Sequence, residues 1–210
     1  GSDGTYSYSY YYKHIKKTVR EADIAVANLE TPLGKSGFGG YPAFCAPDSF
    51  LYAVKESCEA VIEYARRYSA LARDMASKEA NPERKRELEI ISKNCVRVPE
   101  FGATSFYEAC QSFWFIQLLL QVESSGHSIS PGRFDMYMYP YLKKDIDGGL
   151  ITYEKAQELL DCLWVKFNDI NRVRDAASAD GFAGYGMFQN LIVGGQDVHG
   201  MDATNDLSYM

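Results

Sequence analysis

The chain has 210 residues, 46% of them hydrophobic, which is enough to bury a core in one large domain or two small ones. Its net charge of -6, with 24% charged residues, excludes the basic field that would attract a phosphate backbone, so we expect no nucleic acid partner. The most apolar run, residues 112–122, is far shorter than the roughly 20 residues that cross a bilayer, so we expect no membrane partner either.

The five cysteines are widely spaced and include no C-x-x-C pair. This pattern is typical of free thiols in a reducing compartment, rather than of a disulfide framework or a zinc site. Cys58, Cys110 and Cys162 fall within helical patterns, where we expect small core residues. We therefore predict a cytoplasmic protein without a bound metal ion.

The opening of the chain differs in composition from the remainder. It holds a tyrosine-rich stretch at residues 6–12, a short strand-like run at 24–27, and a Gly- and Pro-rich stretch at 31–47. Helical patterns dominate afterwards. We therefore predict a short α/β segment over residues 1–51 and a second, mainly helical domain over residues 52–210.

Two helices are predicted at the start of the second domain. Apolar residues that recur at spacings of three and four predict a helix over residues 53–78. Asn81 followed by Pro82 is typical of an N-cap with proline at the first helical position, so a second helix should run to about residue 94.

A third helix is predicted from a capping signal. Ser105 and Glu108 have the spacing of a capping box, in which the serine accepts from the backbone amide three residues on and the glutamate returns the bond. The helix should reach about residue 123. Its residues 113–120 leave almost no polar face, which predicts burial among other elements.

The rest of the chain alternates between loop, helix and strand signals. Residues 126–135 (GHSISPGRFD) favour a strand end and a loop, and residues 136–144 a short helix. Thr152 is a cap for a further helix with one apolar face, and residues 190–195 (NLIVGG) predict a short buried strand that ends in a turn. This alternation predicts an α/β fold, predominantly helical, in a layered or barrel arrangement.

One long motif identifies a family. The residues SSGHSISPGRFD at 124–135, followed by YMYPY at 137–141, resemble the segment after the long buried helix in glycyl radical dehydratases. Stretches at residues 99–121, 168–196 and 202–210 agree in the same order. Residues 52–210 therefore resemble an interior slice of a pyruvate formate-lyase superfamily enzyme, nearest to the diol- and glycerol-dehydratase branch.

This resemblance implies a partial slice of an α/β barrel in which a glycyl radical loop and a cysteine loop meet. In the family, an activating enzyme with S-adenosylmethionine and an iron–sulfur cluster places the radical on glycine. The cysteine becomes a thiyl, which takes a hydrogen atom from the substrate, and the substrate radical loses its neighbouring hydroxyl. The implied substrate is a small diol or polyol such as glycerol or propane-1,2-diol, and the implied assembly is a homodimer.

The same resemblance assigns the candidate site residues. His127 and Ser128 match positions that contact substrate hydroxyls, and His127 is the candidate catalytic proton donor for the departing hydroxyl. Asp135 matches a position where related lyases place an acidic group near the substrate. The alternatives are that the His-Ser pair is a local hydrogen-bonding feature and that Arg133 and Asp135 form a structural salt link.

The catalytic loops of the family are absent from this sequence. It has neither a Gly-Cys loop followed closely by Glu nor an Arg-Val-x-Gly loop. We therefore expect no radical reaction and no bound cofactor in the chain as it stands. Without barrel strands to pack on, Phe113, Trp114 and Phe115 should be partly exposed.

The opening segment resembles a different family. Residues 3–8, 22–33 and 40–44 are similar to capsule polyglutamate biosynthesis proteins of the CapA type, which have a metallophosphatase-like fold. Glu30 matches a carboxylate beside a proposed metal site there. The expected partner motifs, Gly-Asp upstream and Asn-Asn-His downstream, are missing, so we expect Glu30 to face solvent.

Three functions remain open at this stage. The first is a fragment of a glycyl radical dehydratase or lyase. The second is a CapA-like metal-dependent protein of capsule biosynthesis. The third is an inert helical fragment or fusion. Two unrelated families that meet within one helix indicate a chimera.

Overall fold

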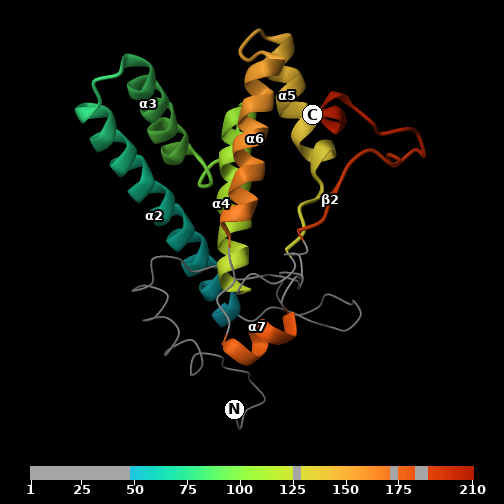
Figure 1. The fold of residues 1–210 in the computed structure, drawn as a ribbon, viewed down its shortest axis with the longest axis horizontal. Helices are drawn as coiled ribbons and strands as arrows, with labels where there is room; N and C mark the ends of the chain where they lie inside the picture. Colours follow the sequence, from blue (N-terminus) through green and yellow to red (C-terminus); the bar gives the residue numbers. More distant parts are fainter. Residues whose placement is uncertain (1–47, 125–128, 171–174, 183–188) are drawn as a thin grey trace. The chain divides into compact units, whose positions relative to one another are not determined.

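The computed structural model describes residues 48–124, 129–170, 175–182 and 189–210, and the chain divides at Tyr64 and Ala65 into two units. In chain order the elements are α2 (Asp48–Lys78), α3 (Pro82–Arg97), α4 (Phe106–Glu123), β1 (Gly132–Arg133), α5 (Phe134–Asp147), α6 (Tyr153–Asp169), α7 (Ala176–Phe182), β2 (Leu191–Ile192) and the 3-10 helix η1 (Asp206–Tyr209) (Figure 1). The described residues are predominantly helical, as predicted. They carry one two-stranded parallel sheet. No closed barrel is visible among them.

The first unit is described only through the start of α2. This helix begins earlier than predicted and ends at Lys78, as predicted. Lys55 and Glu59 form an exposed ion pair of 3.4 Å on its surface. Cys58 is exposed as well, so its prediction as a core residue was wrong. Cys58 lies beside Glu59 and one turn after Lys55, on the solvent-exposed side of the helix.

In the second unit, the rest of α2 packs against α3 through small side chains. The buried residues of this part of α2 are Ala65, Ser69, Ala72 and Ala76. Ser69 and Ser92 exchange hydrogen bonds, because each hydroxyl donates to the other residue's carbonyl, at 2.8 and 2.9 Å. Asn81 caps α3 as predicted, since its side chain accepts from the amides of Glu83 and Arg84.

The start of α4 differs from the prediction in one bond. Ser105 is the N-cap and accepts from the Glu108 amide at 3.2 Å, as predicted. The Glu108 carboxylate, however, bonds one residue earlier than a capping box requires, to the Thr104 amide and hydroxyl at 2.7 and 2.8 Å. Arg97 of α3 lies 3.2 Å from the same carboxylate. This charge explains why Glu108 is drawn away from the Ser105 amide.

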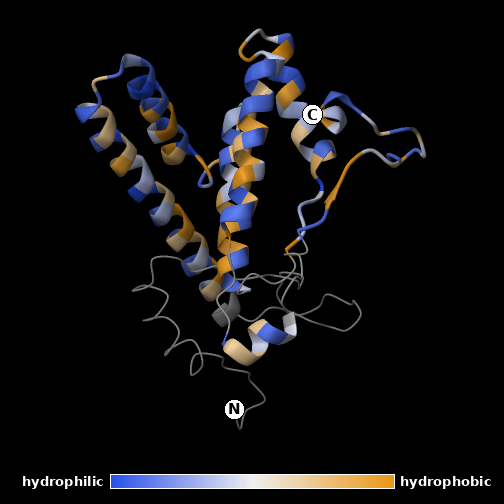
Figure 2. Cartoon of the chain, in the orientation of Figure 1, coloured by the Kyte–Doolittle hydropathy of each residue, from blue (hydrophilic) through white to orange (hydrophobic). Residues whose placement is uncertain are grey.

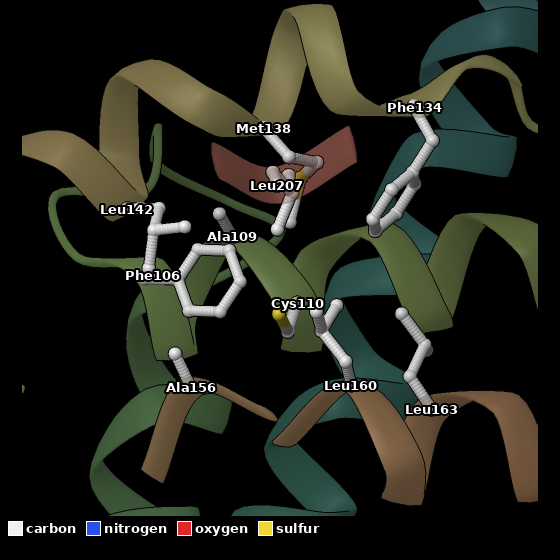
Figure 3. Close-up of a cluster of buried hydrophobic side chains, with 10 residues drawn as sticks. All are labelled: Phe106, Ala109, Cys110, Phe134, Met138, Leu142, Ala156, Leu160, Leu163 and Leu207. Atoms are coloured by element: carbon white, nitrogen blue, oxygen red, sulfur yellow. The ribbon is translucent and has the colours of Figure 1, made fainter. Parts of the chain in front are cut away.

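The core of the second unit lies between α4, α5 and α6. Figure 3 shows its buried side chains, which are Phe106, Ala109, Cys110, Phe134, Met138, Leu142, Ala156, Leu160, Leu163 and Leu207. Cys110 is therefore a core residue as predicted, whereas Cys162 on α6 is exposed and that prediction was wrong. Thr152 caps α6 by accepting from the Lys155 amide at 3.2 Å, as predicted.

The apolar run on α4 is buried unevenly. Phe113 and Trp114 are partly buried, as predicted, and both pack edge-on against Phe167 of α6. Phe115 is only 3% exposed, so its predicted exposure was wrong. Ile116 is 42% exposed, which contradicts the prediction that the whole run is buried. Successive helical residues point to different sides, and α3, α5 and α6 do not cover all of them.

The strand predicted at residues 190–195 is present but not buried. β2 pairs in parallel with β1, with Gly132 opposite Leu191 and Arg133 opposite Ile192. Leu191 and Ile192 are 39% and 51% exposed, although β2 stands out as hydrophobic in Figure 2. The prediction of burial was wrong because this strand has a single neighbour in the described part of the chain. The predicted turn follows, with positive φ at Gly194 and Gly195.

Candidate substrate site

The candidate catalytic residues fall between α4 and β1. His127 and Ser128 lie outside the described residues. The described chain resumes at Ile129, directly after Ser128. The described part of the candidate site therefore consists of the residues that bind Ile129 and the segment that follows it.

Two glutamines of α4 bind the carbonyl of Ile129. The Gln117 amide donates to it at 2.8 Å, and the Gln121 amide donates at 3.4 Å. The two side chains are 3% and 0% exposed and lie one helical turn apart. A carbonyl oxygen has two lone pairs, and this one uses both.

A third glutamine connects this group to α6. Gln117 also donates to the Gln189 side-chain oxygen at 3.1 Å, and Gln189 donates to the Phe167 carbonyl at 3.2 Å. Ser130 accepts from the Asn190 amide at 3.2 Å. The Ile129 carbonyl is thus bound from α4, and the Ser130 side chain is bound from the residue before β2.

Arg133 and Asp135 bind the same turn rather than each other. The Arg133 guanidinium donates to the carbonyls of Gly194 and Gln196, at 3.2 and 2.7 Å. The Asp135 carboxylate accepts from the Gly194 amide at 2.6 Å. Both side chains lie in the described part of the chain, where they bind separate backbone groups of this turn and form no ion pair with each other. The salt-link alternative is replaced by a clamp on the turn after β2.

The turn itself requires glycine. Gly194 has φ +65°, which disfavours any other residue, and a Cβ there would lie 3.0 Å from the Thr204 hydroxyl. Gly195 has φ +86°. These conformations let the Gly194 amide face Asp135 while its carbonyl faces Arg133.

Asp135 also holds η1. It is fully buried at the start of α5, and its Oδ2 accepts from the Ser208 hydroxyl at 2.5 Å. Ser208 in turn accepts from the Asn205 amide at 3.0 Å, within the capping box that starts η1. This role of Ser208 was not predicted, although its spacing from Asn205 is a capping signal in the sequence.

Two buried oxygens near this segment lack a hydrogen-bond partner among the described residues. They are Oδ1 of Asp135 and Oε1 of Gln121.

Tyr137 donates its hydroxyl to the Pro131 carbonyl at 3.0 Å, and burial raises the pKa of Tyr137 well above its ordinary value. The tyrosine therefore stays protonated and acts as a donor at neutral pH.

A pocket of about 440 Å³ lies against the same segment. Its lining residues are Pro131, Trp164, Phe167, Asn168, Gln189 and Leu191. Among the residues that the structure describes, the lining is aromatic and apolar with two amide side chains and has no charged group. Such a surface suits a small neutral ligand that offers a few hydrogen-bonding groups.

Comparison with known families gives matches in two parts of the chain. The model of the pyruvate formate lyase-like family matches residues 41–210. The chain belongs to the pyruvate formate lyase-like family. The model of bacterial capsule synthesis proteins matches residues 2–66, so the two matches overlap from residue 41 to residue 66. Both resemblances predicted from the sequence are confirmed.

Solved structures of diol dehydratases are similar to this member of the family. A structure concerned with 1,2-propanediol dehydration in Roseburia inulinivorans is 64% identical, with a TM-score of 0.75, over 77% of this chain and 20% of its own. The glycerol-bound, B12-independent glycerol dehydratase of Clostridium butyricum is 54% identical, with a TM-score of 0.73, over the same shares.

Curated relatives include enzymes that act on sulfonates. Isethionate sulfite-lyase of Oleidesulfovibrio alaskensis is 43% identical over 77% of this chain and 20% of its own length. The (2S)-3-sulfopropanediol dehydratase of Klebsiella oxytoca is 38% identical over 80% of this chain and 21% of its own. This pyruvate formate lyase-like chain spans about a fifth of the length of these relatives. In the described ranges, no helix is both long and apolar enough to span a membrane.

Proposed function

We propose that this chain is part of a glycyl radical enzyme that dehydrates a small neutral diol, with propane-1,2-diol or glycerol as the substrate. The observation that carries the proposal is the segment at residues 124–141, in a chain 64% and 54% identical to structures concerned with propanediol and glycerol dehydration. Identity to the isethionate and sulfopropanediol enzymes is lower, at 43% and 38%.

The charges of the described segment favour a neutral substrate over a sulfonate. A sulfonate bound in a closed site needs a cationic partner. Arg133 is the cation in the described part of the motif, and the Nη2 of its guanidinium donates to two backbone carbonyls. The described residues that line the nearby pocket include no lysine or arginine. A diol needs only hydrogen bonds, which amide and hydroxyl groups supply.

His127 and Ser128 are proposed to hold the diol. In this proposal His127 donates a proton to the departing hydroxyl, and Ser128 donates to or accepts from the hydroxyl that remains. For Asp135 the proposal is narrower. Its Oδ2 already accepts from Gly194 and Ser208, so we assign Oδ1 to a substrate hydroxyl.

The radical chemistry belongs to groups outside this sequence. The radical on glycine, installed by an activating enzyme with S-adenosylmethionine and an iron–sulfur cluster, supplies hydrogen-atom abstraction from the substrate. The residues of this chain bind, orient and protonate. A cytoplasmic location is part of the same proposal, because oxygen-sensitive radicals and free thiols both require reducing conditions. The proposal also includes a homodimeric assembly.

The boundary between the two family segments is a separate proposal. We place residues 1–51 with the capsule synthesis family and residues 52–210 with the radical enzymes, a boundary that lies where the two family matches overlap. It falls inside α2, which runs unbroken from Asp48 to Lys78. Long-read sequencing of single molecules across the source locus tests the join. One read that carries residues 40–70 intact supports a natural fusion, and its absence shows an artificial chimera.

The activity is tested in the full-length protein that contains this chain. We expect anaerobic activation to produce a glycyl radical signal in electron paramagnetic resonance, with conversion of propane-1,2-diol to propanal and no release of sulfite from isethionate. Without a radical signal, the proposal fails.

A pair of histidine variants then tests the residue assignment. His127→Ala should abolish diol turnover while the radical yield stays at the wild-type level. The exposed His199 gives a matched control, and His199→Ala should turn over normally. Equal rates in the two variants would remove His127 from the mechanism.

A further inference from the structure

A second pocket, of about 500 Å³, is lined by residues of α2, α3 and α4 in the second unit. The described residues that line it do not line the pocket beside Pro131, and they do not belong to the motif at residues 124–141. This second pocket is therefore separate from the proposed diol site.

The lining of the second pocket combines basic and acidic side chains. Among the described residues the basic ones are Arg73 of α2 with Lys93 and Arg97 of α3. The acidic ones are Glu89 of α3 and Glu108 of α4. The described lining thus has an excess of one positive charge, although the chain as a whole carries -6. A hollow with an excess of positive charge attracts anions.

The Glu108 carboxylate is already satisfied within the protein. It is 8% exposed, and its Oε2 accepts from the Thr104 amide and hydroxyl at 2.7 and 2.8 Å. Nε of Arg97 lies 3.2 Å from the same oxygen. Glu108 therefore offsets the charge of Arg97, and the charges of Arg73 and Lys93 remain to be balanced.

Arg73 and Lys93 are exposed and have no ion pair or hydrogen-bond partner among the described residues. Glu89 lies one helical turn before Lys93 and forms no ion pair with it in this part of the chain. Two uncompensated cations on different helices match a dianion. A phosphate monoester is mainly dianionic at pH 7, because its second pKa is about 6. A guanidinium fork binds phosphate oxygens in pairs, and an ammonium adds a point charge.

We propose that this pocket binds the phosphate group of a small ligand, held by the Arg73 guanidinium and the Lys93 ammonium. Its volume is within the range of small-molecule sites. Val96, which is 49% exposed, gives the lining an apolar surface for an organic group attached to the phosphate. The site goes beyond the proposed dehydratase function and does not depend on it.

Calorimetric titration of the whole 210-residue chain tests the site, with phenyl phosphate and inorganic phosphate as separate probes in a phosphate-free buffer. We expect Arg73→Gln to weaken the binding of phenyl phosphate about 10-fold, because it removes a charged hydrogen-bond donor. Glu89→Gln should strengthen binding about 2- to 5-fold, since it removes a repelling charge from the lining. Arg84→Gln is the matched control and should bind as the wild type does, because Arg84 binds Glu87 and does not line the pocket.

The two probes distinguish the sources of the phosphate group. Tighter binding of phenyl phosphate supports an ester as the ligand, and equal binding supports free phosphate. A titration without heat for either probe would overturn the proposal. Equal weakening in Arg73→Gln and Arg84→Gln would overturn it as well, because a general charge effect would then explain the binding. Neither result bears on the proposed dehydratase function, since the titration involves no radical and no diol.

Discussion

Asp135 offers the sharpest test of how the turn after β2 is held. Its buried carboxylate joins α5 to the Gly194 amide at 2.6 Å and to the Ser208 hydroxyl at 2.5 Å. Asp135→Ala removes both bonds. Gly194 is itself buried, so its amide is left without a partner, whereas Ser208 is only partly buried and can turn to water.

The size of the loss in the free energy of unfolding follows from these contacts. A hydrogen bond to a charged group contributes about 1.5–3 kcal/mol, so two would contribute about 3–6 kcal/mol. Part of this stabilisation is offset, because Oδ1 is buried without a partner among the described residues and the substitution removes that penalty. We expect Asp135→Ala to lower the free energy of unfolding by about 2–4 kcal/mol. Asp135→Asn keeps both contacts as neutral bonds and should cost about 1 kcal/mol.

Urea unfolding of the chain, followed by tryptophan fluorescence, measures these differences. Both tryptophans, Trp114 and Trp164, lie in the unit that contains Asp135. The matched control on α5 is Asp147→Ala, because Asp147 is exposed and forms an ion pair with Lys143 one turn away. It should change the free energy of unfolding by no more than about 0.5 kcal/mol.

Either of two results would show that Asp135 does not hold the turn through these two bonds. If Asp135→Ala stays within about 1 kcal/mol of the wild type, the carboxylate does not hold the turn. If Asp135→Asn costs as much as Asp135→Ala, the negative charge itself matters more than the two bonds. The second result would direct attention to Oδ1 and to the substrate assignment.

Three further predictions use other parts of the chain. Burial raises the pKa of Cys110 to about 12, above the value of about 8.5 for an unfolded thiol. The stability that the buried thiol contributes is therefore present below about pH 8.5 and is lost as the pH rises towards 12. At pH 8 a thiol reagent should label the exposed Cys162 at once and Cys110 only after unfolding, and equal labelling rates would contradict the burial of Cys110. Leu160 is 1% exposed, so Leu160→Ala leaves a cavity and should lower the free energy of unfolding in urea by about 2–5 kcal/mol. Val165 is 63% exposed, and Val165→Ala should change this free energy by no more than about 0.5 kcal/mol. In a calorimetric titration with Mn²⁺, the heat of binding should be the same in the wild type and in Glu30→Ala. A heat signal that is lost in Glu30→Ala would instead favour the capsule-type metal function for residues 2–66.

Local signals in the sequence were sufficient for the helix starts and for the family. Asn81, Ser105 and Thr152 cap their helices as predicted, because the bonds of an N-cap join residues two or three positions apart. The motif at residues 124–141 identified the family without a structure, since it depends on the order of residues alone.

Partners distant in the chain were decided only by the tertiary structure. Asp135 binds Gly194 and Ser208, which are 59 and 73 residues away, and no periodicity reports such a pairing. Burial was misjudged for the same reason, because the exposure of Cys162, of Phe115 and of β2 depends on which neighbours cover each face. A helix or strand pattern states which residues share a face, but the packing of other elements determines whether that face meets water.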